Sequence, residues 1–320
     1  PPPDQAWEAL PASEWDRAAA RHLLLRASFS AHPDRVEAIH QAGPAKGVAR
    51  LFGGSRSMPM PEQLESLREE SRETFSNIRG KSDAERRRLR QAFRRKARSV
   101  YNDYAVRWYG LASDPDRSAI EKYVLFLQNI FVVGATKVRN PVLLFQHQQM
   151  LRSAGLGSFV ELTKRVSRSP AMIQYLDLQQ NQRGKPNENF ARELLELFTL
   201  GEGNYTEPDI REAARAFTGY RAVLDRFVFA ARQHDDGRKT VFGQKGRWNG
   251  DEVIDLIFRQ PAAAGFVPKE LCRFYLSDES IPAAYSEALG ESWKRDGFNC
   301  AKLLNRFFQS RLFYHRAFRA

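Results

Sequence analysis

Apolar residues recur at helical spacing along almost the whole 320-residue chain. After residue 82, for example, they fall at Leu89, Phe93, Ala97, Val100 and Tyr104, three or four positions apart. That spacing places them on one face of an amphipathic helix. Hydrophobic residues make up 42% of the chain, which is enough for a substantial core. The sequence therefore predicts a predominantly all-α, multi-helix single domain.

Proline, glycine and capping residues divide this pattern into separate helices. Pro33 follows one break, and Ser82 or Asp83, with Glu85 nearby, is typical of a helix start. We expect helices near 12–28, 33–52, 62–109 with an interruption near 80–83, 116–133, 140–153, 157–168, 186–200 and 206–218, followed by further helices toward the C-terminus.

One region departs from the helical pattern. The segments 227–229 and 240–242 are rich in Phe, Val and Thr, and they flank a polar Asp-Asp-Gly turn at 235–237. This predicts a small two-stranded β-hairpin near 227–243. We expect an N-terminal helical segment, 1–58, packed on a main helical domain, 111–320, with a long charged helical region, 59–110, between them.

The net charge of +12 favours acidic partners such as nucleic acid, anionic lipid headgroups or acidic polysaccharide. Much of this charge lies on one predicted helix, whose basic face contains Arg86, Arg87, Arg90, Arg94 and Arg98. One interpretation is a solvated face paired with the glutamates of 64–73. The other is a docking surface for an anionic partner.

Several classes of protein and site are disfavoured. No run of eighteen apolar residues exists, so no membrane span is expected. Cys272 and Cys300 lack metal-type spacing and lie in apolar helical patterns, which favours two buried thiols over a disulfide. The chain lacks a nucleophile elbow, a phosphate-binding glycine loop and a dinucleotide fingerprint, so no nucleotide cofactor is expected. Any other cofactor stays unknown.

Two polar motifs contain candidate functional residues. The run KPNENFARELLEL at 185–197 has an apolar face and an opposite polar face that includes Glu188, Arg192 and Glu193. This face is either a solvated, salt-bridged surface or part of a site. Asn187 and Asn189 are poor helix formers, so we assign them a capping or hydrogen-bonding role.

The second motif, HDDGRK at 234–239, is either an ordinary turn or a site. As a site, it would use His234 and Asp235 as an acid–base pair together with Glu188 and Glu193. Lys239 and Arg192 would then hold an anionic group. His234 and Asp235 are also weak candidates for metal ligands.

Both motifs resemble those of the bacterial family known as domain of unknown function 1800. The resemblance continues at 200–206, 212–219, 234–243, 250–255 and 269–274, and more weakly at 22–26 and 313–314. It implies an exported, periplasmic or secreted helical protein. It also implies protein partners, among them an exported sulfatase-like protein.

The chain departs from that family at one motif. Family members commonly have a tryptophan, two histidines separated by one residue, and a phenylalanine ahead of a lysine-valine pair. Here Gln128 and Ile130 occupy the histidine positions, and Lys137-Val138 follows. If the family's histidines bind a metal, most of that site is lost here, and no metal is expected. His147 is the nearest histidine that can compensate, although a packing role is commoner for such a residue.

These observations favour a binding or scaffold protein, or an accessory subunit, with a basic surface and a degenerate metal site. The alternative is a cell-envelope enzyme, either a metal-assisted hydrolase or a redox enzyme, built from the two polar motifs. Nucleic-acid binding through 86–98 is a second alternative, for which no stacking platform is recognisable. We expect 186–200 to pack near the hairpin, with Glu188 or Glu193 close to His234 and Lys239.

Overall fold

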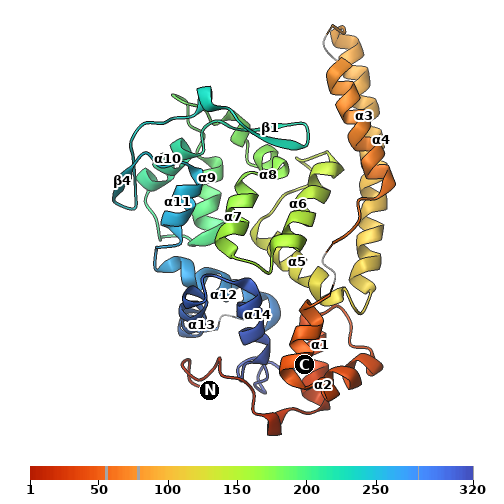
Figure 1. Cartoon of the computed structure of the whole chain (residues 1–320), viewed down its shortest axis with the longest axis vertical. Coiled ribbons are helices and arrows are strands. Elements are labelled where there is room, and N and C mark those ends of the chain that lie inside the picture. Colours follow the sequence, from red (N-terminus) through yellow and green to blue (C-terminus); the bar gives the residue numbers. More distant parts are fainter. Residues whose placement is uncertain (55–56, 78–79, 280, 320) are drawn as a thin grey trace.

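A computed structural model of the chain describes residues 1–54, 57–77, 80–279 and 281–319. As the periodicity predicts, it is predominantly α-helical, with 62% of its residues in helices and two small two-stranded antiparallel sheets (Figure 1). The helices of the body are α5 (Ser118–Ile130), α6 (Pro141–Ala154), α7 (Phe159–Ser167), α8 (Pro170–Tyr175), α9 (Asn189–Glu193), α10 (Glu207–Ala216), α11 (Gly250–Ile257), α12 (Ala262–Tyr275), α13 (Ala283–Arg295) and α14 (Cys300–Gln309).

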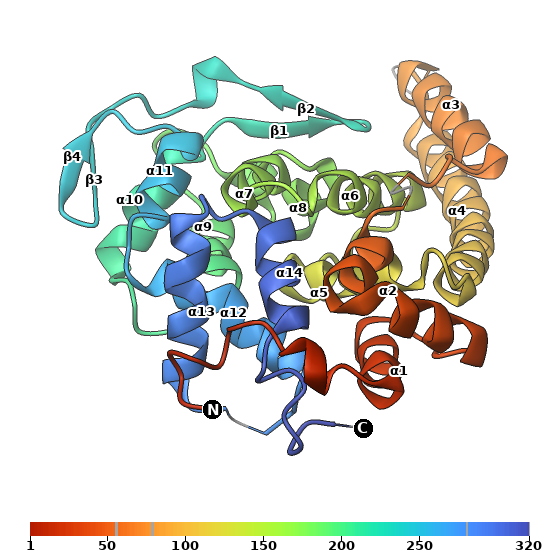
Figure 2. The same ribbon diagram turned by 60° about the horizontal axis from the view of Figure 1, so that its bottom comes forward.

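The N-terminal helices α1 (Arg17–Ala27) and α2 (Pro33–Phe52) lie beside α5 and α14, far away in the sequence (Figure 2). Helix α1 begins later than predicted because Asp16 caps it, accepting a hydrogen bond from the Ala19 amide at 2.6 Å. Their apolar residues, such as Leu23 and Ile39, share one buried core with residues from α5 through α14.

Helices α3 (Glu62–Asn77) and α4 (Asp83–Ser113) form an arm that projects well beyond the body (Figure 1). Ser82 and Glu85 cap α4 reciprocally, as predicted. At its base the arm packs on α6 through a second apolar cluster that includes Leu64, Val100 and Phe145. The outer part of the arm is therefore held mainly by contacts between its own two helices.

The strand pairing differs from the prediction of one hairpin over 227–243. Strand β1 (Tyr220–Val223) pairs with β2 (Arg226–Phe229), and β3 (Lys239–Val241) pairs with β4 (Gln244–Gly246). The turns are local because Leu224, Phe242 and Gly243 adopt positive φ. The Asp-Asp-Gly segment at 235–237 is a separate bend between the two hairpins, in which the Gly237 amide donates to Asp235 at 2.9 Å.

The predicted helix at 186–200 begins only at Asn189 and changes character halfway along. After α9 the chain continues as a π-helical segment, Leu194–Thr199. The six-residue helix α8 was absent from the expected helices because it is too short to show a periodic pattern. Cys272 and Cys300 are free and buried. None of the described helices combines the length and apolar character of a membrane span.

Candidate functional site

The segment just before the first polar motif contacts the second motif and the residue that precedes it. The Arg183 amide donates to the Gln233 carbonyl at 2.8 Å, and the Arg183 guanidinium lies 3.4 Å from Asp236. Asn187 accepts a hydrogen bond from the Asn189 amide at 3.0 Å, and the Asn189 side chain donates to the Leu176 carbonyl at 3.2 Å. These asparagines thus hold the start of α9 on the body.

His234 and Asp235 bond to the end of α10. Nδ1 of His234 lies 2.9 Å from the Thr218 carbonyl oxygen, and its ring packs on Phe229 with centroids 5.1 Å apart. Arg215 donates to the Asp235 carboxylate at 2.8 Å and is the main reason that the pKa of this carboxyl lies below its ordinary value. Both residues therefore stabilise the bend between the hairpins.

Lys239 also has a structural environment. Its buried ammonium donates to the carbonyl oxygens of Asp235 and Gly237 at 2.5 and 3.0 Å. Burial lowers the pKa of this amine. A lysine that caps carbonyl groups inside a turn is poorly placed to hold an external anion.

Arg192 pairs on the surface with Glu207, with both N–O distances at 2.8 Å, and more weakly with Glu188 at 3.5 Å. Glu188 and Arg192 are four residues apart, the spacing of side chains that meet on one face of a helix. These bonds join α9 to the start of α10. Glu188 therefore pairs with the arginine that makes the helix–helix contact, and its described contacts include neither His234 nor Lys239.

Glu193 lies in a different place, at a cavity of about 540 Å³ that we call the Glu193 cavity. Its wall also includes Asn129, Ile130, Lys137 and Arg273, so it is formed by α5, the 132–137 loop, α9 with its π-helical extension, and α12. The expected meeting of Glu193 with His234 and Lys239 does not appear among the described contacts. The polar residues of this short helix therefore have two different surroundings: Glu188 lies in a surface ion pair, and Glu193 lies in a cavity wall.

Gln128 and Ile130, which occupy the resembled family's histidine positions, face different cavities. Ile130 is buried at the Glu193 cavity, whereas Gln128 lines a second pocket on the other side of α5. Positions two apart on a helix point in nearly opposite directions. Among the described residues, no group of three His, Cys, Asp or Glu side chains is arranged to hold a metal ion.

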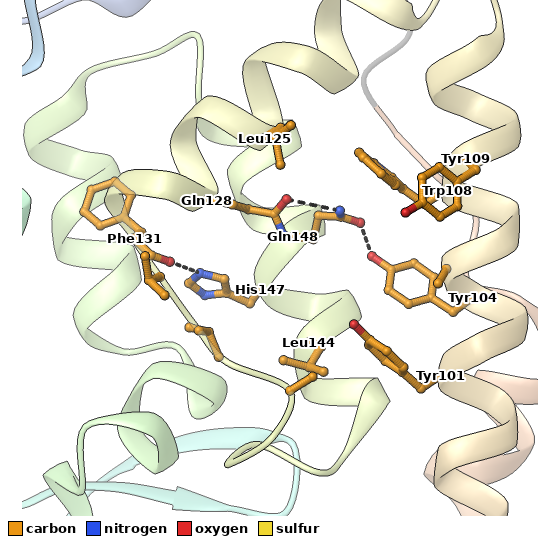
Figure 3. Close-up of a pocket in the computed structure, with 14 residues that line it drawn as sticks. Tyr101, Tyr104, Trp108, Tyr109, Leu125, Gln128, Phe131, Leu144, His147 and Gln148 are labelled. Carbon is orange, nitrogen blue, oxygen red and sulfur yellow. Dashed lines mark hydrogen bonds between the residues drawn. The ribbon is translucent and has the colours of Figure 1, made fainter. Parts of the chain in front are cut away.

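The second pocket, which we call the aromatic pocket, has a volume of about 290 Å³ (Figure 3). Tyr101, Tyr104, Trp108 and Tyr109 of α4 form one side, and α5 and α6 form the other. Figure 3 shows Gln128, His147 and Gln148 on this opposite side. All these side chains are neutral, so the pocket offers aromatic surface together with amide and hydroxyl groups.

A buried polar network fixes one wall of this pocket. Tyr104 donates to Gln148, whose amide donates to Gln128 at 3.5 Å (Figure 3). Behind Gln148, Arg152 donates to its side chain at 3.2 Å and to Glu121 at 2.7 and 2.9 Å. Since most of these groups are bonded to each other, the wall is preorganised.

His147 lies in the same wall but is a packing residue. Its ring nitrogens lie 3.0 Å from the Ser169 hydroxyl and 3.2 Å from the Phe131 carbonyl oxygen. Burial lowers its pKa to about 4, so the imidazole is neutral at physiological pH. The predicted compensation of the missing histidines by His147 has no support in these contacts.

A third cavity, of about 530 Å³, adjoins the aromatic pocket and shares Tyr101, Ala135 and Leu144 with it. Its wall includes Arg94, Arg98 and Arg139. We call these two adjoining cavities together the α4 groove. One end of this groove is basic and the other is aromatic.

The arginines continue outward along the same flank of α4. Arg87, Arg90, Arg94, Arg98, Tyr101 and Trp108 follow each other at intervals of three, four or seven residues, which places them on one side of the helix. The four arginines are exposed. No acidic group within the described part of the chain pairs with them. Of the basic residues over 86–98, Lys96 pairs with Glu70 and Arg86 with Asp83.

The sequence interpretation included the arginines but missed the aromatic pocket. The sequence pattern places Tyr104 on the apolar face of α4. It assigns no role to Tyr101, Trp108 and Tyr109. The available signal was the succession of arginine and then aromatic residues at helical spacing along one flank. What the sequence did not indicate is that the loop after α5 and the start of α6 face that flank.

Comparison with known proteins gives one match. A family model described as a protein of unknown function, DUF1800, matches residues 22–320. No curated protein and no solved structure matches the chain.

Proposed function

We propose, from the premise that this chain belongs to the DUF1800 family of proteins of unknown function, that it is a binding protein for an acidic polysaccharide. One observation carries the proposal: a single flank of α4 presents four exposed arginines and then leads into the α4 groove. The acid groups of the polymer would lie on the arginines, and a sugar ring would enter the aromatic pocket.

The length of the flank suits a polymer. From Arg87 to Trp108 is 21 residues, or roughly 30 Å at 1.5 Å per residue. The four arginines occupy the first 11 residues of this span, roughly 16 Å, and such regularly spaced positive charges match a chain that carries repeated carboxylate or sulfate groups. Arginine suits such groups because its planar guanidinium donates two parallel hydrogen bonds.

The distribution of aromatic residues favours polysaccharide over nucleic acid. Proteins that bind single-stranded nucleic acid place rings along the path of the backbone, so that successive bases stack. Here the exposed arginines from 87 to 98 have no exposed aromatic residue between them, and the rings gather at one end. A polymer that needs ionic contacts along its length and one ring-binding pocket fits this arrangement better.

The predicted enzyme site receives less support. His234, Asp235 and Lys239 bond within a bend, Glu188 pairs with Arg192, and Gln128 and Ile130 face different cavities. We therefore include a degenerate metal site in the proposal. Metal analysis of the purified protein and of His234→Ala tests it, since an equimolar metal that this variant loses would restore the enzyme interpretation. The exported location implied by the resemblance completes the proposal.

The test of polymer binding uses heparin as the acidic polysaccharide. We expect wild-type protein to bind it, with affinity falling steeply as salt rises because charge interactions are screened. Replacing Arg87, Arg90, Arg94 and Arg98 with Gln should weaken binding at least tenfold. The matched control replaces Arg21, Arg247, Arg259 and Arg295, which are exposed elsewhere, with Gln. It removes the same charge and should retain most of the affinity.

Equal weakening in the two quadruple variants would show that only net charge matters and would overturn the proposal. Tighter binding of single-stranded DNA than of heparin at equal salt would indicate that the arginine flank of α4 binds nucleic acid instead. Tyr109→Ala, which removes an exposed ring from the pocket, should weaken binding without changing its salt dependence.

A further inference from the structure

The Glu193 cavity has a size and composition that the polymer-binding proposal does not explain. Its volume of about 540 Å³ lies within the usual range for small-molecule pockets, roughly 300–1,000 Å³. It lies on the other side of the end of α5 from the aromatic pocket, and Val132 lines both. A ligand can therefore occupy one cavity while the other is empty.

The cavity wall contains both signs of charge. Glu193 and Glu270 provide carboxylates, and Lys137 and Arg273 provide cations. Lys137 already bonds to Asp177 at 2.6 Å, which leaves Arg273 as the main cation available to a ligand. In the part of the chain that the structure covers, Arg273 has no ion-pair partner. The wall therefore complements a ligand that carries one positive and one negative group.

Of the two acids, Glu193 is the one on a different helix from Arg273, because Glu270 and Arg273 are both on α12. Its side chain is half-buried, and no donor in the described residues hydrogen-bonds to its carboxylate. Burial, with a smaller contribution from the Glu196 carboxylate, raises its pKa above the ordinary value. A cationic group placed beside it would supply the missing partner and reverse that shift.

Apart from Asn129, the rest of the wall is apolar or aromatic. Tyr175, Leu176, Leu197, Phe198 and Phe266 line it. Leu197 is 52% exposed at the cavity mouth. A ligand with an apolar body would cover it.

The backbone beside Glu193 is also unusual. The π-helical segment Leu194–Thr199 follows directly, with the Leu200 amide bonded to the Leu195 carbonyl at 2.9 Å and the Thr199 hydroxyl to the Leu194 carbonyl at 2.5 Å. Short π-helical segments are rare and occur frequently at functional sites. Leu197 and Phe198 of this segment line the cavity together with Glu193, which directly precedes it.

We propose that the Glu193 cavity binds a short apolar peptide by its two charged ends, with the terminal ammonium at Glu193 and the terminal carboxylate at Arg273. A peptide of two residues supplies both charges and an apolar body that the aromatic and leucine side chains cover. No charged side chain on the peptide is needed.

The experiment is calorimetric titration with the dipeptide leucyl-phenylalanine and with the same peptide N-acetylated, C-amidated or blocked at both ends. We expect wild-type protein to bind the free dipeptide and to lose at least tenfold in affinity with each blocked end. In Glu193→Gln, N-acetylation should no longer matter. In Arg273→Gln, C-amidation should no longer matter. Glu202→Gln and Arg211→Gln, both exposed outside the cavity wall, serve as matched controls.

Failure of wild-type protein to bind the free dipeptide would overturn the proposal, as would equal affinity for the free and doubly blocked peptides. These two results need no variant, so they hold even if a substitution impairs folding. Peptide binding should survive the quadruple arginine substitution of α4. This separates the peptide site from the polysaccharide site, because either can fail alone.

Discussion

Arg152 and Glu121 form a fully buried ion pair between α6 and α5, with Nε and Nη2 of the arginine 2.9 and 2.7 Å from the two carboxylate oxygens. The indole of Trp108 also donates to Glu121, at 3.0 Å. The pair thus connects the arm to the body directly behind the aromatic pocket. A charge pair in this position provides geometry more than net stability.

Glu121→Gln should be strongly destabilising, because it leaves the buried guanidinium of Arg152 without a compensating charge. We expect the free energy of unfolding to fall by roughly 3–5 kcal/mol. Urea denaturation followed by circular dichroism measures it. Glu161→Gln, which removes an exposed carboxylate that pairs with Lys164, is the control and should change stability by less than about 1 kcal/mol. Similar small losses in both variants would refute a structural role for the buried pair.

His147 should make the fold sensitive to mild acid. Because burial lowers its folded pKa to about 4 from the ordinary 6.5, the unfolded chain binds a proton between these values while the folded chain does not. The contribution of the neutral His147 imidazole to the free energy of unfolding is fully present above pH 6.5. It is lost as pH falls toward 4, at up to about 1.4 kcal/mol per pH unit. Urea midpoints at pH 7.5, 6 and 5 measure the trend.

In His147→Gln the part of the slope due to this residue should disappear, whatever the variant's absolute stability. His22 is also buried, and burial lowers its pKa to about 4, so some slope should remain. A variant with the wild-type slope would contradict the assignment.

Asp225 links the β1–β2 turn to the arm, since Arg68 and Arg72 donate to it at 2.7 and 3.0 Å. Burial acts to raise the pKa of this carboxyl, but the two arginines outweigh it and hold the pKa below its ordinary value. Asp225→Asn should therefore loosen the arm, with a loss of about 1–3 kcal/mol in local stability.

Hydrogen exchange of the α3 amides is the direct measurement for Asp225→Asn. Exchange should accelerate in α3 and remain unchanged in α13. The two arginines stabilise only the charged carboxylate of Asp225, which is why its pKa is depressed. In wild-type protein the stability contributed by this contact is therefore fully present above about pH 4 and is lost as pH falls below the ordinary aspartate pKa. Unchanged α3 exchange would show that apolar packing alone holds the arm.

Gly290 allows α12 and α13 to pack closely. A Cβ atom there would lie 2.4 Å from the Ala264 carbonyl oxygen and 3.0 Å from the Gly265 amide nitrogen, which are backbone atoms that cannot turn away. Gly290→Ala should cost about 2–3 kcal/mol. Gly265→Ala is the matched control, because the nearest atom would be 4.0 Å away. It should be neutral or stabilising by up to about 1 kcal/mol. Melting temperatures that fall equally would disprove the close-packing explanation.

Cys272 and Cys300 should not react with thiol reagents in the folded protein. Both side chains are buried, and burial raises the pKa of each thiol to about 12, so neither the access nor the thiolate that such reagents need is present. Ellman's reagent should detect two thiols in urea and almost none in buffer. Rapid reaction of either cysteine in buffer would place it at the surface.

The sequence alone predicted the helical class, most helix positions, a helix start at Ser82 or Asp83, and buried thiols in preference to a disulfide. These depend on spacing and on neighbours within a few residues. The prediction that 227–229 and 240–242 pair with each other is wrong. Both segments have strand-forming neighbours closer in the sequence, and the choice of partner depends on which turns adopt positive φ.

Only the tertiary structure decided which side chains share a cavity. Glu188 and Glu193 are five residues apart, yet Glu188 pairs with Arg192, which also bonds to Glu207 of α10, whereas Glu193 lines a cavity with α12. A helix turns about 100° per residue, so each face meets a different neighbour. Likewise, the sequence placed arginine and aromatic residues on one flank of α4. Only packing of the 132–141 segment against that flank turned it into a groove.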